Sequence, residues 1–364
     1  MPKQSKKKAT AKKSTRKATS STKPKSGQPE EENEPKPKGP IVTRPRGTQD
    51  ILPQDHKYWE YVIENARMLL RGWYFQELQT PLFEEKALFE RTVGEDSDIV
   101  QKEMFELKSR SRGSHYVLRP EATAPIARSY IEHGMRSWPR PVKLFTYGPY
   151  FRYERPQAGR FRQHHQISLE VFGSPAPISD VEVIYVLHLL FRQLGMEDYV
   201  VRVNSIGLPG ERKEYIKLLK EHYRRNIRKL SREDKERLKN NPLRVLDSKD
   251  EKAQRLANTA PRLLDHLSDD SKNHFEYVTN TLQELEVPYE IAPGLVRGLD
   301  YYTHTVFEFV PRTGEGEGQT SFTAGGRYDG LVKLVGGRDT PAVGAGIGIE
   351  RVIDRIKQEG LELS

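Results

Sequence analysis

A polar β-hairpin is the feature of this sequence that most constrains its fold. Residues 148–173, GPYFRYERPQAGRFRQHHQISLEVFG, consist of two alternating segments joined by the loop RPQAGR. With a period of two residues, the first strand places Tyr150, Arg152 and Glu154 on one face. The second strand has an apolar face of Ile167, Leu169 and Val171 and a polar face of His164, Gln166, Ser168 and Glu170. The pattern predicts a sheet with one face toward a core and one charged face.

Six charged side chains lie in this hairpin: Arg152, Glu154, Arg155, Arg160, Arg162 and Glu170. A charge run is most often a solvated surface, and that is the alternative here. However, guanidinium forks match the geometry of phosphate, and a fixed carboxylate matches an ammonium group. Arginines, carboxylates and an amide on one sheet face therefore indicate a site that holds a polyanion and an amine side by side.

Length and cysteine content narrow the class of protein. The 364 residues are enough for a large core, in two domains or in one domain with an insertion. The chain has no cysteine, which excludes disulfides and thiolate metal sites and favours a reducing compartment. No apolar run approaches a bilayer span, and the N-terminus lacks a hydrophobic signal core. We expect a soluble, intracellular protein with no membrane partner.

The net charge of +9 is concentrated in the N-terminal tail. Residues 1–40 hold 12 Lys or Arg against 4 Glu and contain almost no large apolar side chains. Such a segment cannot bury enough surface to offset its ordering entropy, so we predict that it is disordered. Binding to nucleic acid through phosphate contacts and a purely solubilising role are both consistent with this composition.

The remaining chain alternates between strand and helix patterns. We expect a catalytic core with a first part at 41–207, a charged helical insertion at 208–286, and a second part at 287–364. The segment SDVEVIYVLHLLFRQLGM predicts a strong helix with Ser179 or Asp180 as its N-cap. Helices between noncontiguous antiparallel strands predict the α+β class. Neither a P-loop nor a G-x-G-x-x-G motif is present, which excludes the two commonest nucleotide-binding folds.

Three C-terminal motifs add candidate binding residues. LVRGLDYYTHTVFEF places Arg297 at the mouth of a strand, although a structural ion pair with Asp300 is the alternative. AGGRYDGLV predicts a tight turn. In GIGIERV, Arg351 lies at the start of a helix, where the helix dipole favours acids, and it could stack on a flat ring there. This mismatch favours a binding role for Arg351.

Seven segments together carry a resemblance to a known family: RPRGTQDILP, RPEATAPIAR, the hairpin, NPLRVLDSKD, LVRGLDYYTHTVFEF, AGGRYDGLV and VGAGIGIERV. Their order resembles that of the histidyl-tRNA synthetases, which are class II aminoacyl-tRNA synthetases. The resemblance extends from residue 41 to about residue 358.

The resemblance implies a six-stranded antiparallel sheet flanked by helices and a cytoplasmic homodimer whose interface includes RPRGTQDILP. It implies that histidine reacts with ATP, supplied as its Mg²⁺ complex, to give histidyl-adenylate and pyrophosphate. The histidyl group then moves to the 3′-end of tRNA(His). No protein-bound structural metal is expected.

The resemblance also assigns roles to residues. Arg152 and Arg297 would act on the α-phosphate during catalysis. The ATP-binding set is Arg152, Glu154, Arg160, Arg162 and Arg351, of which Glu154 and Arg351 lie at the adenine and Arg160 and Arg162 toward the outer phosphates. The histidine-binding set is Glu121, Thr123, Gln166, Glu170, Arg297, Tyr301, Tyr302 and Tyr328, and its three tyrosines frame the imidazole. Arg155 and Gln157 would meet the tRNA end.

Two departures from the family pattern leave an alternative open. The sequence stops at Ser364, so we expect the α/β anticodon-binding domain of the family to be missing, as in a fragment or a paralogue. The Lys-rich tail is also outside the bacterial pattern. A non-charging paralogue, such as the histidine-sensing regulatory subunit of ATP phosphoribosyltransferase, is the alternative function. Arg152, Arg351, the full VRGLDYY motif and the helical insertion favour the enzyme.

Overall fold

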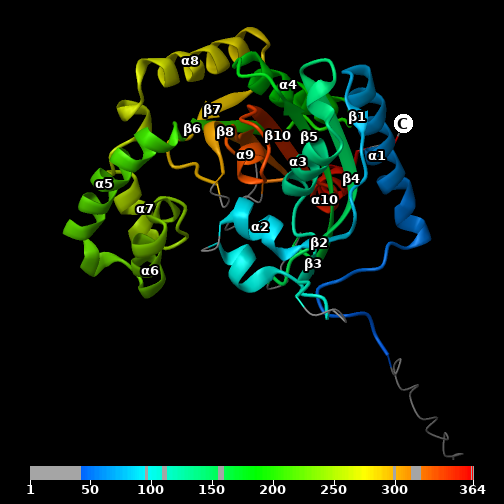
Figure 1. Cartoon of the computed structure of the whole chain (residues 1–364), viewed down its shortest axis with the longest axis horizontal. Coiled ribbons are helices and arrows are strands. Elements are labelled where there is room, and N and C mark those ends of the chain that lie inside the picture. The colour runs from blue at the N-terminus through cyan, green and yellow to red at the C-terminus, as the bar shows by residue number, and fades with distance from the viewer. Residues whose placement is uncertain are drawn as a thin grey trace, which may run out of the picture. The chain divides into compact units, whose positions relative to one another are not determined.

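A central mixed β-sheet organises the chain from Arg44 onward (Figure 1). The computed structural model describes residues 42–94, 97–108, 113–154, 160–297, 301–312, 321–361 and 363. Across the sheet, the strand order is β1, β4, β5, β10, β9, β8, β6, β7. The strands are β1 (Gln76–Glu77), β4 (Val142–Phe151), β5 (Gln163–Phe172), β6 (Tyr199–Ser205), β7 (Tyr289–Ile291), β8 (Thr303–Pro311), β9 (Thr323–Arg327) and β10 (Ala342–Gly348).

The α+β class is confirmed, and the strand count needs a correction. The six central strands, from β4 to β6 in the sheet order, pair only in antiparallel fashion, as expected. The structure adds the short edge strands β1 and β7, each of which pairs in parallel with its neighbour. Segments of two and three residues carry too little alternation to predict. Elsewhere in the described residues, β2 (Phe83–Glu85) and β3 (Tyr116–Leu118) form a separate small sheet.

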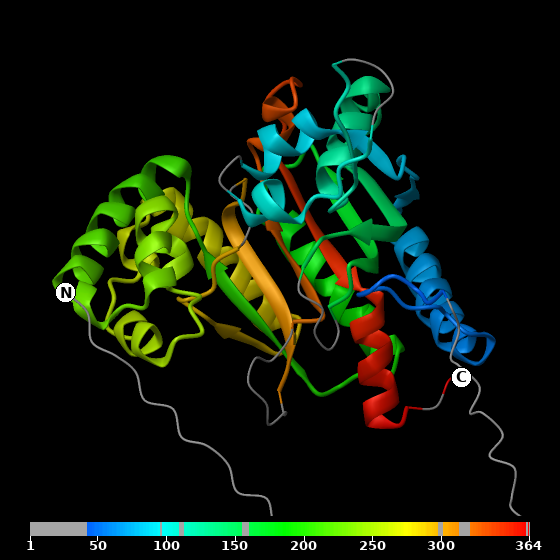
Figure 2. The ribbon, with the colours of Figure 1, turned by 90° about the horizontal axis from the view of Figure 1, so that it is seen from below.

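Helices lie on both faces of the sheet, and they form two separate core clusters with its strands (Figure 2). The α-helices are α1 (His56–Gly72), α2 (Lys86–Val93), α3 (Thr123–Glu132), α4 (Ile178–Gln193), α5 (Pro209–Arg225), α6 (Arg232–Asn240), α7 (Glu251–Ala257), α8 (Asp269–Glu284), α9 (Leu331–Leu334) and α10 (Ile349–Glu359). Short 3₁₀ turns lie at Pro53–Asp55, Met135–Ser137, Ile227–Lys229, Pro242–Val245 and Leu263–His266, and a π-turn at Ile99–Glu103. No helix in the described part of the chain is long and apolar enough to cross a bilayer.

The β4–β5 hairpin has the alternating faces that its sequence predicts, but β4 ends at Phe151, so Arg152 and Glu154 lie beyond the strand. Strands β4 and β5 pair over ten residues, with Tyr150 opposite His164. Ile167, Leu169 and Val171 are buried in a core that also contains side chains from α1, α4 and α10. The opposite face of β5 carries the polar side chains toward the site. The hairpin therefore separates an apolar layer from a polar one.

The helical insertion forms an arm beside the sheet. Between β6 and β7 the described chain forms only helices and turns, and α5, α6 and α7 gather together away from the strands (Figure 1). Helix α8 differs because it packs on α4 and β8. The domain boundaries at 208 and 286 stay a prediction.

One local prediction was wrong. Helix α4 begins at Ile178 after Pro177, and neither Ser179 nor Asp180 caps it. Asp180 is fully buried and forms an ion pair with Arg327. The turn expected in AGGRYDGLV lies at residues 329–330, directly after β9, which pairs with β8 and β10. A Cβ on Gly325 would lie 2.6 Å from the Phe307 ring, so the glycine is needed for strand packing.

Candidate active site

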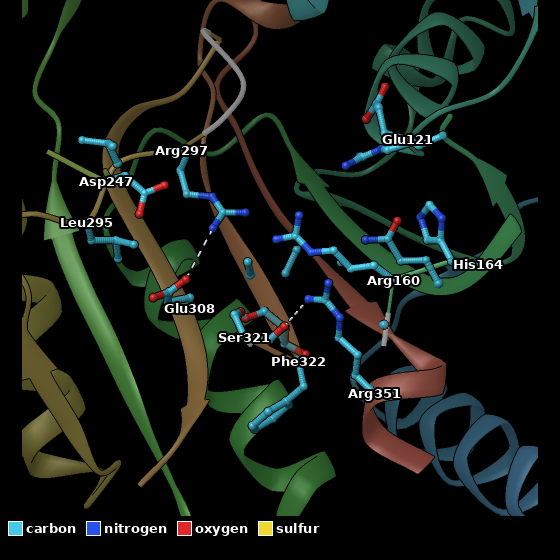
Figure 3. A pocket seen from close by; sticks show the side chains of 18 of the residues that line it. Glu121, Arg160, His164, Asp247, Leu295, Arg297, Glu308, Ser321, Phe322 and Arg351 are labelled. Carbon is cyan, nitrogen blue, oxygen red and sulfur yellow. Dashed lines mark hydrogen bonds and ion pairs between the residues drawn. The ribbon is translucent and has the colours of Figure 1, made fainter. Parts of the chain in front are cut away.

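A cavity of about 850 Å³ opens on the polar face of the sheet. Its lining comes from the β4–β5 hairpin, the segment before α3, strands β8, β9 and β10, the start of α10, and the arm residues at 246–249. Figure 3 shows the side chains of Glu121, Arg160, His164, Arg297 and Arg351 around one space. The cavity brings together most of the predicted site residues from segments far apart in the sequence. Those that line it are Glu121, Thr123, Arg152, Glu154, Arg160, Gln166, Arg297, Tyr301, Tyr302 and Arg351.

Two buried carboxylates mark one end of the cavity. Glu121 precedes α3 and accepts backbone N–H bonds from Thr123 and Ala124, at 2.7 and 2.9 Å. Thr123 Oγ1 donates to Glu170 Oε1 at 2.8 Å, and the Tyr328 hydroxyl donates to Glu170 Oε2. Burial raises the pKa of Glu121, and it raises the pKa of Glu170 to about 8. This end offers two desolvated acceptors that a bound ammonium group would stabilise as carboxylates.

Three tyrosines form an aromatic wall at the same end. Tyr301 and Tyr302 line the cavity and are each 6% exposed. Tyr328 lies behind them, with its ring centroid 5.6 Å from Tyr301 in an edge-to-face arrangement. We call Tyr301, Tyr302 and Tyr328 the aromatic wall. Such a wall accommodates a flat ring of modest polarity.

Strand β10 forms the floor of the cavity because Gly344 and Gly346 leave room there for side chains of β5. A Cβ on Gly344 would overlap the Glu170 carboxylate, and one on Gly346 would overlap the Gln166 amide. Gly344 pairs with Glu170 across the strands, and Gly346 pairs with Ser168. The side chains of Glu170 and Gln166 therefore lie over β10, and that of Gln166 reaches the cavity.

Arginines dominate the other end of the cavity. Arg152 donates to the Pro120 carbonyl at 2.8 Å, and its Nη1 lies 3.9 Å from Glu154. Arg160 pairs with Glu154 at 3.3 Å, and its side chain is 46% exposed. Arg351 donates to the Ser321 carbonyl. Burial lowers the pKa of Arg351 to about 10, and nearby Arg160 and Arg152 also act to lower it. The surplus of positive charge suits a polyphosphate.

Arg297 reaches the cavity from the opposite wall. Its Nη1 lies 3.8 Å from Glu308 on β8, and its Nε is buried without a hydrogen-bond partner in the described ranges. Figure 3 shows its guanidinium pointing toward the middle of the cavity, as do those of Arg160 and Arg351. Burial raises the pKa of Glu308, and the positive charge of Arg297 opposes that shift. Asp300, the alternative partner, lies outside the described residues.

Several sequence-predicted residues are not on the cavity lining. Glu170 and Tyr328 are not among the lining residues, but Glu170 accepts hydrogen bonds from Thr123, which lines the cavity, and from Tyr328. Arg162 stacks on Tyr153, with its guanidinium carbon 3.7 Å from the ring centroid, and donates to the Glu154 carbonyl at 3.3 Å. Arg155 and Gln157 lie outside the described residues.

The family model for histidyl-tRNA synthetase matches residues 47–352. The chain belongs to the histidyl-tRNA synthetase family. It is 47% identical over 309 residues to the histidine–tRNA ligase of Thermosynechococcus vestitus, covering 85% of this chain and 72% of the relative. It is 44% identical over 323 residues to the ligase of Limosilactobacillus fermentum, covering 88% and 75%.

Solved structures agree with this assignment. The chain matches apo S. aureus histidyl-tRNA synthetase with a TM-score of 0.72 and 36% identity, over 89% of this chain and 76% of that one. A Bacillus halodurans protein described as an ATP phosphoribosyltransferase regulatory subunit/histidyl-tRNA synthetase matches with a TM-score of 0.60 but only 23% identity, over 87% and 84%. That second likeness shows the fold alone. The family resemblance and the function of histidine–tRNA ligase, predicted from the motifs, are confirmed.

The cavity lining also contains residues that sequence reasoning did not assign. His164 lines the cavity, and burial lowers its pKa to about 3, with Arg152 and Arg351 adding to the shift. Glu350 lines it too and accepts the backbone N–H of His165 at 2.9 Å. The alternation of the hairpin had placed His164 on the polar face. Nothing in the sequence pattern marked Glu350, because its partner is 185 residues away.

Proposed function

We propose that the cavity is where this ligase performs both half-reactions, with histidine at the carboxylate end and ATP at the arginine end. The observation that carries this proposal is the division of one continuous cavity into an acidic, aromatic end and a basic end. An ammonium group and an imidazole match the first end, and a triphosphate matches the second. Family membership supplies the identity of both substrates.

In the first half-reaction, a carboxylate oxygen of histidine attacks the α-phosphorus, and the bond to the bridging oxygen of the β-phosphate breaks. Pyrophosphate leaves, together with the Mg²⁺ that accompanies ATP as part of the substrate. Arg152 and Arg297 lie on two sides of the cavity and would hold the α-phosphate between them. Preorganised donors of this kind stabilise charge that grows in the transition state.

The carboxylate end orients the amino acid. Glu121, Thr123, Gln166 and Glu170 would surround the α-amino group, while the aromatic wall frames the imidazole. Because Thr123 already bridges toward Glu170 and Glu121 is held by two backbone amides, these acceptors need little rearrangement on binding. Such preorganisation reduces the entropic cost of binding.

In the second half-reaction, a hydroxyl at the tRNA 3′-end attacks the carbonyl carbon of the adenylate, and AMP leaves. Arg155 and Gln157 of the hairpin loop are the residues we assign to the tRNA end. We also propose a homodimer with the segment RPRGTQDILP at its interface, and a cytoplasmic location. Sedimentation analysis of the purified chain tests the dimer directly.

Histidine-dependent exchange of pyrophosphate into ATP tests the central assignment. We expect exchange with histidine and Mg²⁺-ATP, and none above background with the other amino acids. Transfer to tRNA(His) in the same preparation tests the second half-reaction. A folded chain that exchanges no pyrophosphate with histidine would contradict the assignment and favour a histidine-binding paralogue.

A further inference from the structure

A buried cluster of charged and imidazole groups lies next to the aromatic wall, and none of the assigned substrate roles uses it. Its centre is Asp180 on α4, which is 0% exposed, as is Arg327 at the end of β9. Arg327 Nε donates to Asp180 Oδ1 at 2.9 Å. Asp180 Oδ2 accepts from Thr305 Oγ1 at 2.6 Å and lies 2.7 Å from His274 Nε2 on α8. The cluster therefore joins α4, α8, β8 and β9.

The imidazoles of this cluster hold the start of β8. His274 stacks on His304 with ring centroids 4.7 Å apart and planes 11° from parallel. His304 has a φ of +47°, and its Nδ1 is buried without a hydrogen-bond partner in the described residues. Burial lowers the pKa of His304, and the neighbouring His274 adds to the shift. A residue other than glycine adopts a positive φ of this kind only where the surrounding contacts hold it there.

The cluster is tied to the aromatic wall from two sides. Arg327 immediately precedes Tyr328, whose hydroxyl donates to Glu170 in the site. His304 follows Tyr302 by two residues, and between them Thr303 Oγ1 accepts from the Asp329 backbone at 3.3 Å. Asp329 also accepts from Arg327 Nη1 at 3.1 Å. A shift of the ion pair would thus move both tyrosine segments.

Stability alone does not account for this arrangement. Desolvation of two buried charges largely cancels their attraction, and well-packed apolar groups often stabilise a fold as much. Apolar groups, however, form no directional hydrogen bonds and so cannot fix the orientation of their neighbours. Arg327 also donates to the carbonyls of Ser174 and Ala176, at 3.0 and 3.1 Å. With these contacts, its guanidinium has acceptors on several sides and one allowed orientation.

We propose that Asp180, Arg327, Thr305 and His274 form a positioning network that sets the aromatic wall, and thereby the affinity for histidine. The proposal rests on the assignment of the acidic end to the amino acid. It also makes α8, the helix that follows the arm, a part of amino-acid recognition although α8 lines no part of the cavity.

Two substitutions test the network. Asp180→Asn removes the charge, and Thr305→Val removes one hydrogen-bond donor while keeping the shape of the side chain. Asp234→Asn is the matched control, since Asp234 is 1% exposed and faces Arg237 at 3.3 Å in the arm, away from the cavity lining. Pyrophosphate exchange gives KM for histidine and for ATP, and thermal melting gives the stability of each variant.

We expect Asp180→Asn to raise the KM for histidine about tenfold and Thr305→Val to raise it less, with the KM for ATP within about twofold of the parent. Asp234→Asn should melt earlier and leave both KM values unchanged. An unchanged KM for histidine in Asp180→Asn, or an equal rise for both substrates, would overturn the network. If Asp180→Asn does not fold, Thr305→Val alone decides by the same criterion.

Hydrogen exchange separates a failure of the network from a failure of the assigned function. If the parent chain shows no histidine-dependent pyrophosphate exchange, the proposed function is refuted. The network is then tested by amide hydrogen exchange alone. We then expect the amides of 301–305 and 327–329 to exchange faster in Asp180→Asn than in Asp234→Asn. Equal protection in the two variants would show that the cluster does not hold these segments.

Discussion

The two ends of the cavity differ in how complete they are before any substrate binds. At the acidic end, Glu121 and Glu170 are buried and already hydrogen bonded. At the basic end, Arg160 and Arg351 stand close enough for their positive charges to interact, and Arg160 is nearly half exposed. The acidic end is buried and hydrogen bonded like a protein core. At the basic end, neighbouring positive charges repel one another, and a bound polyphosphate would reduce this repulsion. We expect substitutions to affect different kinetic constants at each end.

The largest effect is expected at Arg297, between the two ends. Arg297→Ala should lower the kcat of pyrophosphate exchange by about 10²- to 10³-fold with little change in either KM, because it removes a donor that acts on developing charge. Exchange kinetics and thermal melting of the same preparation check this.

Arg297→Lys is the control, since it keeps the charge and loses the bidentate fork. If Arg297 is only a structural partner of Glu308 or Asp300, Arg297→Ala should melt several degrees earlier and retain a near-normal kcat. That result would remove Arg297 from the mechanism.

The next effect is expected at the acidic end. Glu121→Ala and Glu170→Ala should each raise the KM for histidine by about 10- to 100-fold and the KM for ATP far less, because each leaves an ammonium group without its carboxylate. Steady-state exchange at varied histidine and varied ATP measures the split. Equal effects on both substrates would show that the two ends are not specialised.

A smaller effect is expected at the basic end. Arg351→Ala should raise the KM for ATP about tenfold through the loss of stacking and charge, and leave the KM for histidine nearly unchanged. Arg355→Ala on the same helix is the matched control, because Arg355 pairs with Asp198 and Glu359 and does not line the cavity. If Arg355→Ala raises the KM for ATP as much, the increase results from a general disturbance of α10 and not from the loss of Arg351.

The smallest effect is a pH dependence of stability. Burial raises the pKa of Glu170 from 4.5 to about 8, so the folded state retains a proton that the unfolded state loses. The contribution of Glu170 to stability is complete below pH 4.5 and is lost as the pH rises to about 8. The parent should therefore lose a few degrees more in Tm across this window than Glu170→Gln. Parallel Tm profiles for the two proteins would contradict the shift.

The sequence predicted the parts of the molecule that depend on local pattern. The alternation in β5 placed Gln166 and Ser168 toward the cavity and Leu169 in the core, as the structure has them. Helical periodicity also identified the helices around the sheet. These features are predictable because each depends on the pattern of residues that are close together in the sequence.

Other features could not be predicted, because they depend on contacts between distant segments. Asp180 fits the pattern of a helix cap, but a partner 147 residues away holds it in the interior. Arg162 lies two residues from Arg160 and has the same chemistry, yet it stacks on Tyr153 and does not line the cavity. Strands as short as β1 leave almost no trace in the sequence. Such placements require the three-dimensional fold.

The two glycines of β10 at the floor of the cavity restrict which substitutions this sequence can accept. Because the carboxylate of Glu170 occupies the space above Gly344, and the amide of Gln166 the space above Gly346, each glycine is required by one side chain of the candidate site. In a saturation mutagenesis screen, even alanine should be lost at both positions, while buried neighbours such as Val343 accept other apolar residues. A larger residue at either position would need a second, simultaneous substitution that removes Glu170 or Gln166 from the site. Strand β10, which has few functional side chains of its own, is thus among the segments least tolerant of substitution.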